Sequence, residues 1–192
     1  MEQIRQAIQQ MIRITDDDLA FFLKDSVVRT YKRQELLSLP MVVPNEIYFI
    51  NKGILRVIIT DTEGTEHTVH FALENQFIAD YTGFMLQQPS MYALQAVTDL
   101  EVVTLPRSAI DWGYQSLDQG DRLGRLIAEY YFMYQDNRIK NSYARTPKER
   151  YDSINDVFPN IHNRVPQKLI ASYLGITPVH LSRLKKTDYK KT

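Results

Sequence analysis

The sequence predicts an α+β protein: an antiparallel β-roll (jelly roll) with flanking helices, then one long helix and a small all-α helix-turn-helix domain. Three observations predict this order. Seven short β-rich runs fill 27–106, apolar residues recur at helical spacing along 107–145, and a helix-turn-helix pattern occupies 167–186. We therefore expect three units, with the roll and its N-terminal helices in 1–106, the long helix in 107–145 and the small domain in 146–192.

The first 26 residues predict two short helices. Ile4, Ile8 and Ile12 recur at helical spacing. Thr15 stands where a side chain can cap a second helix, which would carry Leu19 on its apolar face.

The roll is predicted by runs of β-forming residues with turn residues between them. The runs are 27–31, 36–39, 47–51, 54–60, 67–72, 92–97 and 100–105. Turn sequences at 51–53 and 61–64 contain glycine, and seven short strands at this spacing are typical of an antiparallel sandwich or jelly roll. Residues 76–88 interrupt the alternation, and we expect an irregular stretch with a short helix there.

Residues 107–145 predict one long helix with a heptad-like apolar stripe. The stripe comprises Leu123, Leu126, Tyr130 and Met133, with Ile127 and Tyr134 beside it. It can pack on the roll or against a second copy. We expect its first half to pack on the roll and its second half to form the seam of a homodimer, with Gly124 allowing close backbone approach near the start of the seam.

The helix-turn-helix is predicted by residues at fixed offsets from Gln167. Ala171 is the fifth residue, where two helices cross closely, and Gly175 is the ninth, where the turn requires positive φ. Thr177 suits the N-cap of the second helix, and Pro178 suits its first position.

Two flanking features complete this small domain. Thr146-Pro147 followed by Glu149 predicts the start of a helix at the beginning of the domain. Only six residues follow Lys186, too few for a two-stranded wing.

Charge is unevenly distributed along a chain whose net charge is zero. Residues 161–192 carry seven basic residues and one acidic residue, a net charge of +6, which leaves −6 on 1–160. This split is typical of a basic nucleic-acid reader on an acidic body.

The second helix of the motif would therefore enter the major groove of double-stranded DNA. Arg183 can read guanine, whereas His180 and Ser182 can reach base edges or phosphates. The residues suited to phosphate contacts are Lys185, Lys186, Lys190 and Lys191. The candidate DNA-binding residues are Thr177, His180, Ser182, Arg183, Lys185 and Lys186.

Composition excludes several other classes of protein. The absence of cysteine excludes disulfides, thiolate metal sites and thiol redox chemistry. The sequence has neither a signal-peptide pattern nor an apolar run of about 18 residues, so we expect a soluble cytoplasmic protein with no membrane partner. No nucleophile triad, carboxylate pair or phosphate loop stands out, so we expect no enzymatic activity and no catalytic residue.

The order of these units resembles the CRP/FNR family of bacterial transcription regulators over nearly the whole chain. Within the roll, 47–56 and 61–64 resemble the family's strand–Gly–strand signature and its following hairpin. Residues 164–183 resemble the short, wingless members from Bacteroidetes-type bacteria. The resemblance implies a homodimeric regulator with a cyclic-nucleotide-binding-like roll, a small-molecule effector and RNA polymerase as a further partner.

The sequence departs from the cyclic-nucleotide-binding members at the ligand site. Those members hold the ribose with a Gly-Glu pair and the cyclic phosphate with an Arg-Ser or Arg-Thr pair. Here these pairs fall at about Ile78-Ala79 and Ser90-Met91, and no Arg or Lys lies between residues 56 and 107. Burying a phosphate without a cation is costly. We therefore expect no cofactor and no cyclic AMP at the usual site.

Two alternatives for the pocket stay open. Asp80 could replace the missing carboxylate after a one-residue shift, with backbone amides holding the phosphate. Tyr81 and Tyr92 could instead line a pocket for a neutral effector, or they could be part of the core. The candidate ligand-binding residues are Ile78, Ala79, Asp80, Tyr81, Ser90, Met91 and Tyr92.

Two histidines in one predicted strand suggest no metal site. His67 and His70 lie three residues apart, so they should point to opposite faces, and we expect a solvated hairpin.

The base-reading positions also differ from the family's Arg-Glu…Arg triad. They fall here at Pro178, Val179 and Arg183, so an operator sequence cannot be carried over. The alternative to a DNA-binding regulator is a cyclic-nucleotide or other small-molecule-binding module that does not read DNA specifically.

Overall fold

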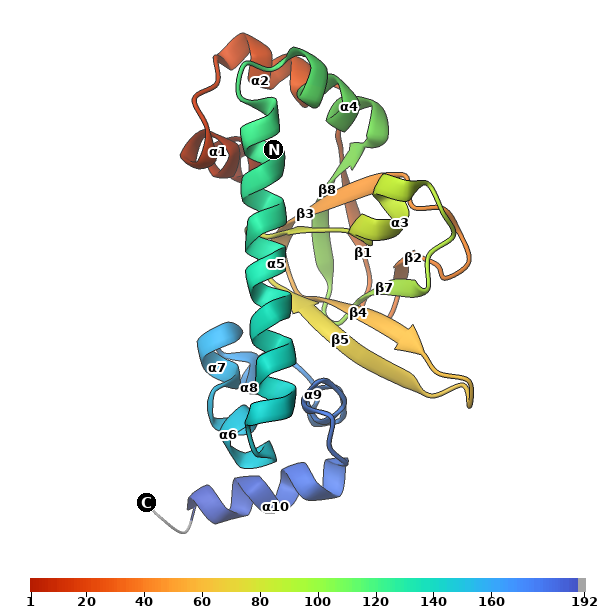
Figure 1. The fold of residues 1–192 in the computed structure, drawn as a ribbon, viewed down its shortest axis with the longest axis vertical. Coiled ribbons are helices and arrows are strands. Elements are labelled where there is room, and N and C mark those ends of the chain that lie inside the picture. Colours follow the sequence, from red (N-terminus) through yellow and green to blue (C-terminus); the bar gives the residue numbers. More distant parts are fainter. Residues whose placement is uncertain (190–192) are drawn as a thin grey trace.

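The computed structural model of the chain describes residues 1–189 and shows a β-roll flanked along one side by a long helix (Figure 1). The helices α1 (Glu2–Met11) and α2 (Asp16–Phe22) lie at one end of this helix, and the C-terminal helices lie at its other end. Thr15 caps α2 by accepting a hydrogen bond from the Asp18 amide (3.1 Å). The predicted fold class is confirmed.

The roll consists of two four-stranded antiparallel sheets. The first has the order β1 (Val27–Tyr31), β8 (Leu100–Pro106), β3 (Glu46–Lys52) and β6 (Phe77–Ile78). The second has the order β2 (Leu36–Ser38), β7 (Tyr92–Ala96), β4 (Leu55–Thr60) and β5 (Glu66–Ala72). The short strand β6 and the helix α3 (Tyr81–Leu86) form the interruption expected at 76–88.

Glycine makes the two turns around β4 possible. Gly53, between β3 and β4, has φ +97°, and a Cβ atom there would lie 2.4 Å from the Asp99 carbonyl oxygen. Gly64, in the hairpin between β4 and β5, has φ +81°. Both conformations are strained for residues that carry a side chain.

Three buried clusters hold the chain together. The interior of the roll contains Tyr48, Ile50, Leu55, Val57, Leu94 and Val102. The N-terminal helices pack through Ile4, Ile8 and Phe22 on one end of the first sheet. The C-terminal helices form a third cluster, which includes Phe71 of β5.

The single helix expected over 107–145 is divided into α4 (Arg107–Ser116) and α5 (Gly120–Ala144). Leu117 is extended (φ −77°, ψ 133°) and ends α4. The two helices then cross so closely that a Cβ atom on Gly120 would lie 1.9 Å from the Gly113 carbonyl oxygen. The break therefore depends on a contact between two glycines that helical periodicity does not reveal.

The C-terminal part is all helical. It contains α6 (Pro147–Asp152), α7 (Ile154–Val157), α8 (Ile161–Arg164), α9 (Gln167–Leu174) and α10 (Pro178–Tyr189). Thr146 and Glu149 form a capping box at the start of α6, as the sequence predicts. No helix among residues 1–189 combines the length and the apolar composition that a membrane span needs.

Candidate nucleic-acid interface and sensor pocket

Helices α9 and α10 form a helix-turn-helix whose local geometry follows from its sequence. Ala171 is fully buried between the helices, and Gly175 ends α9 at φ 67°. Thr177 accepts a hydrogen bond from the His180 amide (3.1 Å), which caps α10. Leu181 is buried, so α10 is held against α9 through this side.

The opposite side of α10 is exposed. Val179, Arg183 and Lys186 are exposed and follow one another at steps of four and three, so they share one face of the helix. His180 and Ser182 are exposed beside them.

The remaining positively charged candidates differ in their placement. Lys185 is half-buried, and Lys190 and Lys191 lie outside the described residues. The described face thus presents polar and positively charged groups at the end of the molecule farthest from α1 and α2 (Figure 1).

Helix α9 is packed on the roll through both apolar and polar contacts. The Tyr173 ring lies 5.5 Å from the Phe71 ring of β5. The Thr68 amide of β5 donates a hydrogen bond to the Ser172 hydroxyl (2.9 Å). Arg164, just before α9, makes a bidentate ion pair with Glu74, just after β5. The position of the helix-turn-helix is therefore coupled directly to the second sheet.

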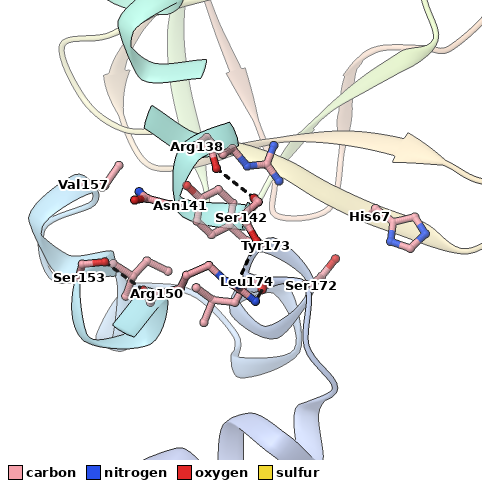
Figure 2. A pocket seen from close by; sticks show the side chains of 12 residues that line it. His67, Arg138, Asn141, Ser142, Arg150, Ser153, Val157, Ser172, Tyr173 and Leu174 are labelled. Atoms are coloured by element: carbon pink, nitrogen blue, oxygen red, sulfur yellow. Dashed lines mark hydrogen bonds between the residues drawn. The ribbon is translucent and has the colours of Figure 1, made fainter. Parts of the chain in front are cut away.

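A polar pocket of about 300 Å³ lies where α5, α6, α9 and β5 meet (Figure 2). Arg150 lines it and donates hydrogen bonds to the backbone carbonyl of Arg145 (2.8 Å), just after α5, and to that of Leu174 (3.2 Å), at the end of α9. A cation on these carbonyls stabilises both helix C-termini.

A second pocket, of about 420 Å³, lies between the roll and α5. Five of the predicted ligand-binding residues line it: Ile78, Ala79, Asp80, Tyr81 and Tyr92. The Asp80 carboxylate caps α3 by accepting a hydrogen bond from the Gly83 amide (3.1 Å). This bond engages one oxygen of the carboxylate that the alternative interpretation assigns to a ribose.

Ser90 and Met91 are not brought to this pocket. The Ser90 hydroxyl is buried and bonds with the Tyr92 backbone, accepting from its amide at 2.8 Å and donating to its carbonyl at 3.0 Å. Met91 is 69% exposed. The pair that would correspond to the phosphate-binding Arg-Ser is therefore a structural turn here.

One cation at this pocket, Arg138 of α5, was not predicted from the sequence. Along α5, Tyr131, Gln135 and Arg138 all line the pocket and follow one another at steps of four and three. This helical spacing was visible in the sequence, but these three residues lie beside the seam stripe and are not a run of apolar residues, so they did not indicate a binding site.

His70 corrects the expectation of a solvated hairpin. His67 is exposed and lies 2.7 Å from the Asp61 carboxylate, but His70 is only 4% exposed and lies under Tyr134, with a ring distance of 4.4 Å. Burial, together with the nearby Arg138 charge, lowers the pKa of His70 to about 3. Its ring is therefore neutral at physiological pH.

The predicted seam residues fall into two groups. Leu123 is buried in the N-terminal cluster, Ile127 packs against that cluster, and the Tyr134 hydroxyl lies 3.1 Å from that of Tyr173. Leu126 is half-buried, whereas Tyr130 and Met133 are 47% and 57% exposed.

Two further features of α5 bear on the seam. Gly124 allows a close approach within the chain, because a Cβ atom there would lie 2.4 Å from the Tyr114 ring of α4. Further exposed apolar side chains on α5 are Phe132, Ile139 and Tyr143.

Comparisons with known proteins agree with this architecture. Residues 28–116 match the cyclic nucleotide-binding domain family. FixK2 from Bradyrhizobium japonicum has a similar structure at 15% identity, with TM-score 0.75 and coverage of 86% of this chain and 85% of that one. CLP from Xanthomonas campestris, described as a c-di-GMP-responsive global regulator, gives TM-score 0.73 at 14% identity, covering 92% and 93%.

A protein from Eubacterium rectale assigned to the CRP/FNR family of transcriptional regulators gives TM-score 0.72 at 13% identity, covering 93% of this chain and 85% of that one. No curated protein matches the chain in sequence. At these identities the similarity establishes the fold.

Proposed function

We propose that this chain, which has the fold of the CRP/FNR regulators and a cyclic nucleotide-binding domain at 28–116, is a homodimeric transcription regulator that binds duplex DNA through α10. It acts in the cytoplasm, without enzymatic activity, and contacts RNA polymerase from its operator. The proposal rests on the exposed face of α10, which carries Arg183 and Lys186. Leu181, on the opposite side of the helix, is buried and holds α10 in place.

The two basic residues of this face have different parts in the proposal. Arg183 contacts a base edge, where a guanidinium can bind guanine through two hydrogen bonds. Lys186 contacts a phosphate, which contributes affinity but no sequence information.

Fluorescence anisotropy with a DNA sequence enriched by selection from a random library tests this assignment. Arg183→Ala should weaken binding to the enriched site by about 1–3 kcal/mol and relax the base preference at one position. Lys186→Ala should weaken enriched and random sequences alike and reduce the salt dependence. Lys24 follows the end of α2 by two residues, and α2 lies at the other end of the molecule from α10 (Figure 1). Lys24→Ala is therefore the matched control and should bind as the unmodified protein does. Failure to enrich any sequence, together with no binding at low salt, would contradict a DNA-binding function.

The dimer is proposed to form along the exposed part of α5. Leu126, Tyr130 and Met133 present apolar surface there. Two parallel copies of α5 about a two-fold axis would cover this surface and place the two α10 helices for successive major grooves, about 34 Å apart.

Cyclic AMP is proposed not to be the effector through the usual phosphate site. Ser90 is engaged in a turn, and the residues that line the pocket near α3 include the Asp80 carboxylate. Calorimetric titration should give a dissociation constant no better than about 1 mM, near 4 kcal/mol of binding free energy. Micromolar binding of cyclic AMP or cyclic GMP would refute this part of the proposal.

A second candidate function rests on the pocket itself. A cavity of about 420 Å³ between roll and helix also suits a small-molecule-binding module that does not read DNA specifically. The DNA-binding measurement distinguishes the two, because only the regulator gives a salt-dependent, sequence-selective complex.

A further inference from the structure

The pocket between the roll and α5 combines apolar walls with one cationic side chain. Val57, Ile78 and Tyr92 line it from the roll, and Tyr131 lines it from α5. Arg138 completes the lining from about two turns further along α5. Such a combination favours a ligand with an apolar body and one charged group.

The charge of Arg138 is not neutralised within the described part of the chain. Arg138 is half-buried, and its guanidinium forms no hydrogen bond or ion pair with the side chains and backbone described over residues 1–186. The guanidinium carbon lies 5.0 Å from the centre of the Tyr173 ring. By contrast, the guanidinium of Arg56 bonds to Gln95 and Glu66, and that of Arg107 bonds to the Phe84 carbonyl and Asp111.

Two further observations indicate where negative charge is favoured. The positive charge of Arg138 is felt by buried His70, whose pKa it helps to lower. Asp80 lines the same pocket from the N-terminus of α3. A negative charge on a ligand near α3 would therefore be repelled by the Asp80 carboxylate. Negative charge is therefore favoured at the α5 wall and disfavoured at α3.

We propose that this pocket binds a small organic anion other than a cyclic nucleotide, with its charged group on Arg138 and its apolar body against the roll. This site would give the proposed regulator a class of effector. Ligand binding itself does not depend on that proposed function, whereas an effect of the ligand on DNA binding does. A charged donor in a half-buried site should contribute roughly tenfold to a hundredfold in affinity.

The same arginine connects the pocket to the helix-turn-helix. The Arg138 guanidinium also lines the polar pocket beside α9, above Tyr173 (Figure 2). The Tyr173 hydroxyl in turn contacts the Tyr134 hydroxyl of α5 (3.1 Å). An anion bound to Arg138 competes with the Tyr173 ring for the guanidinium, so ligand binding alters a contact between α5 and α9.

A matched pair of fluorescent probes tests the charge requirement on the full chain. The probe 8-anilinonaphthalene-1-sulfonate is an organic anion, and N-phenyl-1-naphthylamine is the same aromatic body without the sulfonate. Arg138→Gln should lower the affinity for the anionic probe roughly tenfold to a hundredfold and change the affinity for the neutral probe by no more than about twofold. Arg138→Lys should retain most of the anionic binding. Arg125→Gln, on the same helix but paired with Glu129, is the matched control and should change neither probe.

The location is tested by Ala79→Trp, which places a large side chain in the pocket and should abolish binding of both probes. Two results would refute the assignment of the ligand to this pocket. One is unchanged binding of both probes to Ala79→Trp, and the other is unchanged affinity of Arg138→Gln for the anionic probe. The anionic probe should also change the DNA affinity of the unmodified protein and not that of Arg138→Gln. A DNA affinity that the probe leaves unchanged would overturn the coupling. Absence of any DNA binding would refute the proposed function. The probe titrations would still show whether this pocket binds an organic anion.

Discussion

Substituting His70 by phenylalanine should change how the stability of the protein depends on pH. His70 packs against the rings of Tyr134 (4.4 Å), Phe158 (5.8 Å) and Tyr131 (6.1 Å). Phenylalanine keeps an aromatic ring in this apolar setting but cannot bind a proton. The variant therefore isolates the titration of one buried side chain.

The sign follows from the two protonation states. Burial lowers the pKa of His70 to about 3 in the folded protein, from an ordinary value of 6.5. Between these values the unfolded chain binds a proton that the folded chain does not, so the free energy of unfolding falls as pH falls through 6.5 and levels off near pH 3. From pH 7.5 to pH 5 this loss amounts to about 2 kcal/mol. The other titrating groups, including His162, are present in both proteins and cancel in the comparison.

Urea denaturation of both proteins at pH 7.5, 6.5, 5.5 and 5 measures the effect. The stability of His70→Phe relative to the unmodified protein should rise by about 2 kcal/mol across this range, whatever its value at pH 7.5. A relative stability that is constant to within about 0.5 kcal/mol would show that His70 is protonated or solvated in the folded protein, which would refute its burial under α5.

Three further predictions concern the assembly, the turn and the docking of the small domain. Leu126→Lys combined with Met133→Lys should give monomers in sedimentation equilibrium, because unpaired charges would be buried at the seam; a variant that stays dimeric would place the interface elsewhere. Gly175→Ala should destabilise the protein in urea by about 1–2 kcal/mol, because nothing surrounds the added Cβ and only the positive φ opposes it. Gly175→Asn should cost less, and equal losses would mean that the conformation is not the cause. Glu74→Gln should speed amide exchange in α9 by weakening the pair with Arg164, worth at most about 1 kcal/mol, while the strands of the roll stay protected; equal acceleration in both would show that the pair does not hold the small domain.

Local signals in the sequence predicted the elements whose conformation depends on their own residues. Gly53 and Gly64 adopt positive φ in turns that were predicted from the presence of these glycines, and Gly175 does so between α9 and α10. Thr177 caps α10 because its hydroxyl lies within reach of the His180 amide, a contact that spans only three residues.

Features that depend on contacts between distant segments were not predicted. The division of α4 from α5 follows from the crossing at Gly113 and Gly120, and the burial of His70 requires α5 and α7 to cover β5. Arg138 shows the same limitation for the candidate site. Arg138 follows Ile78, on the opposite wall of the pocket, by 60 residues, so no pattern within the roll sequence indicates it.

The length of α5 gives it the properties of a lever. Its 25 residues span about 37 Å at about 1.5 Å per residue, and the C-terminal helices sit at the end away from α1 and α2. A tilt of about 5° at the roll would displace the far end by about 3 Å, close to the ~3.4 Å that separates successive base pairs of DNA. A ligand that tilts α5 by this angle would therefore shift α10 by about one base-pair step.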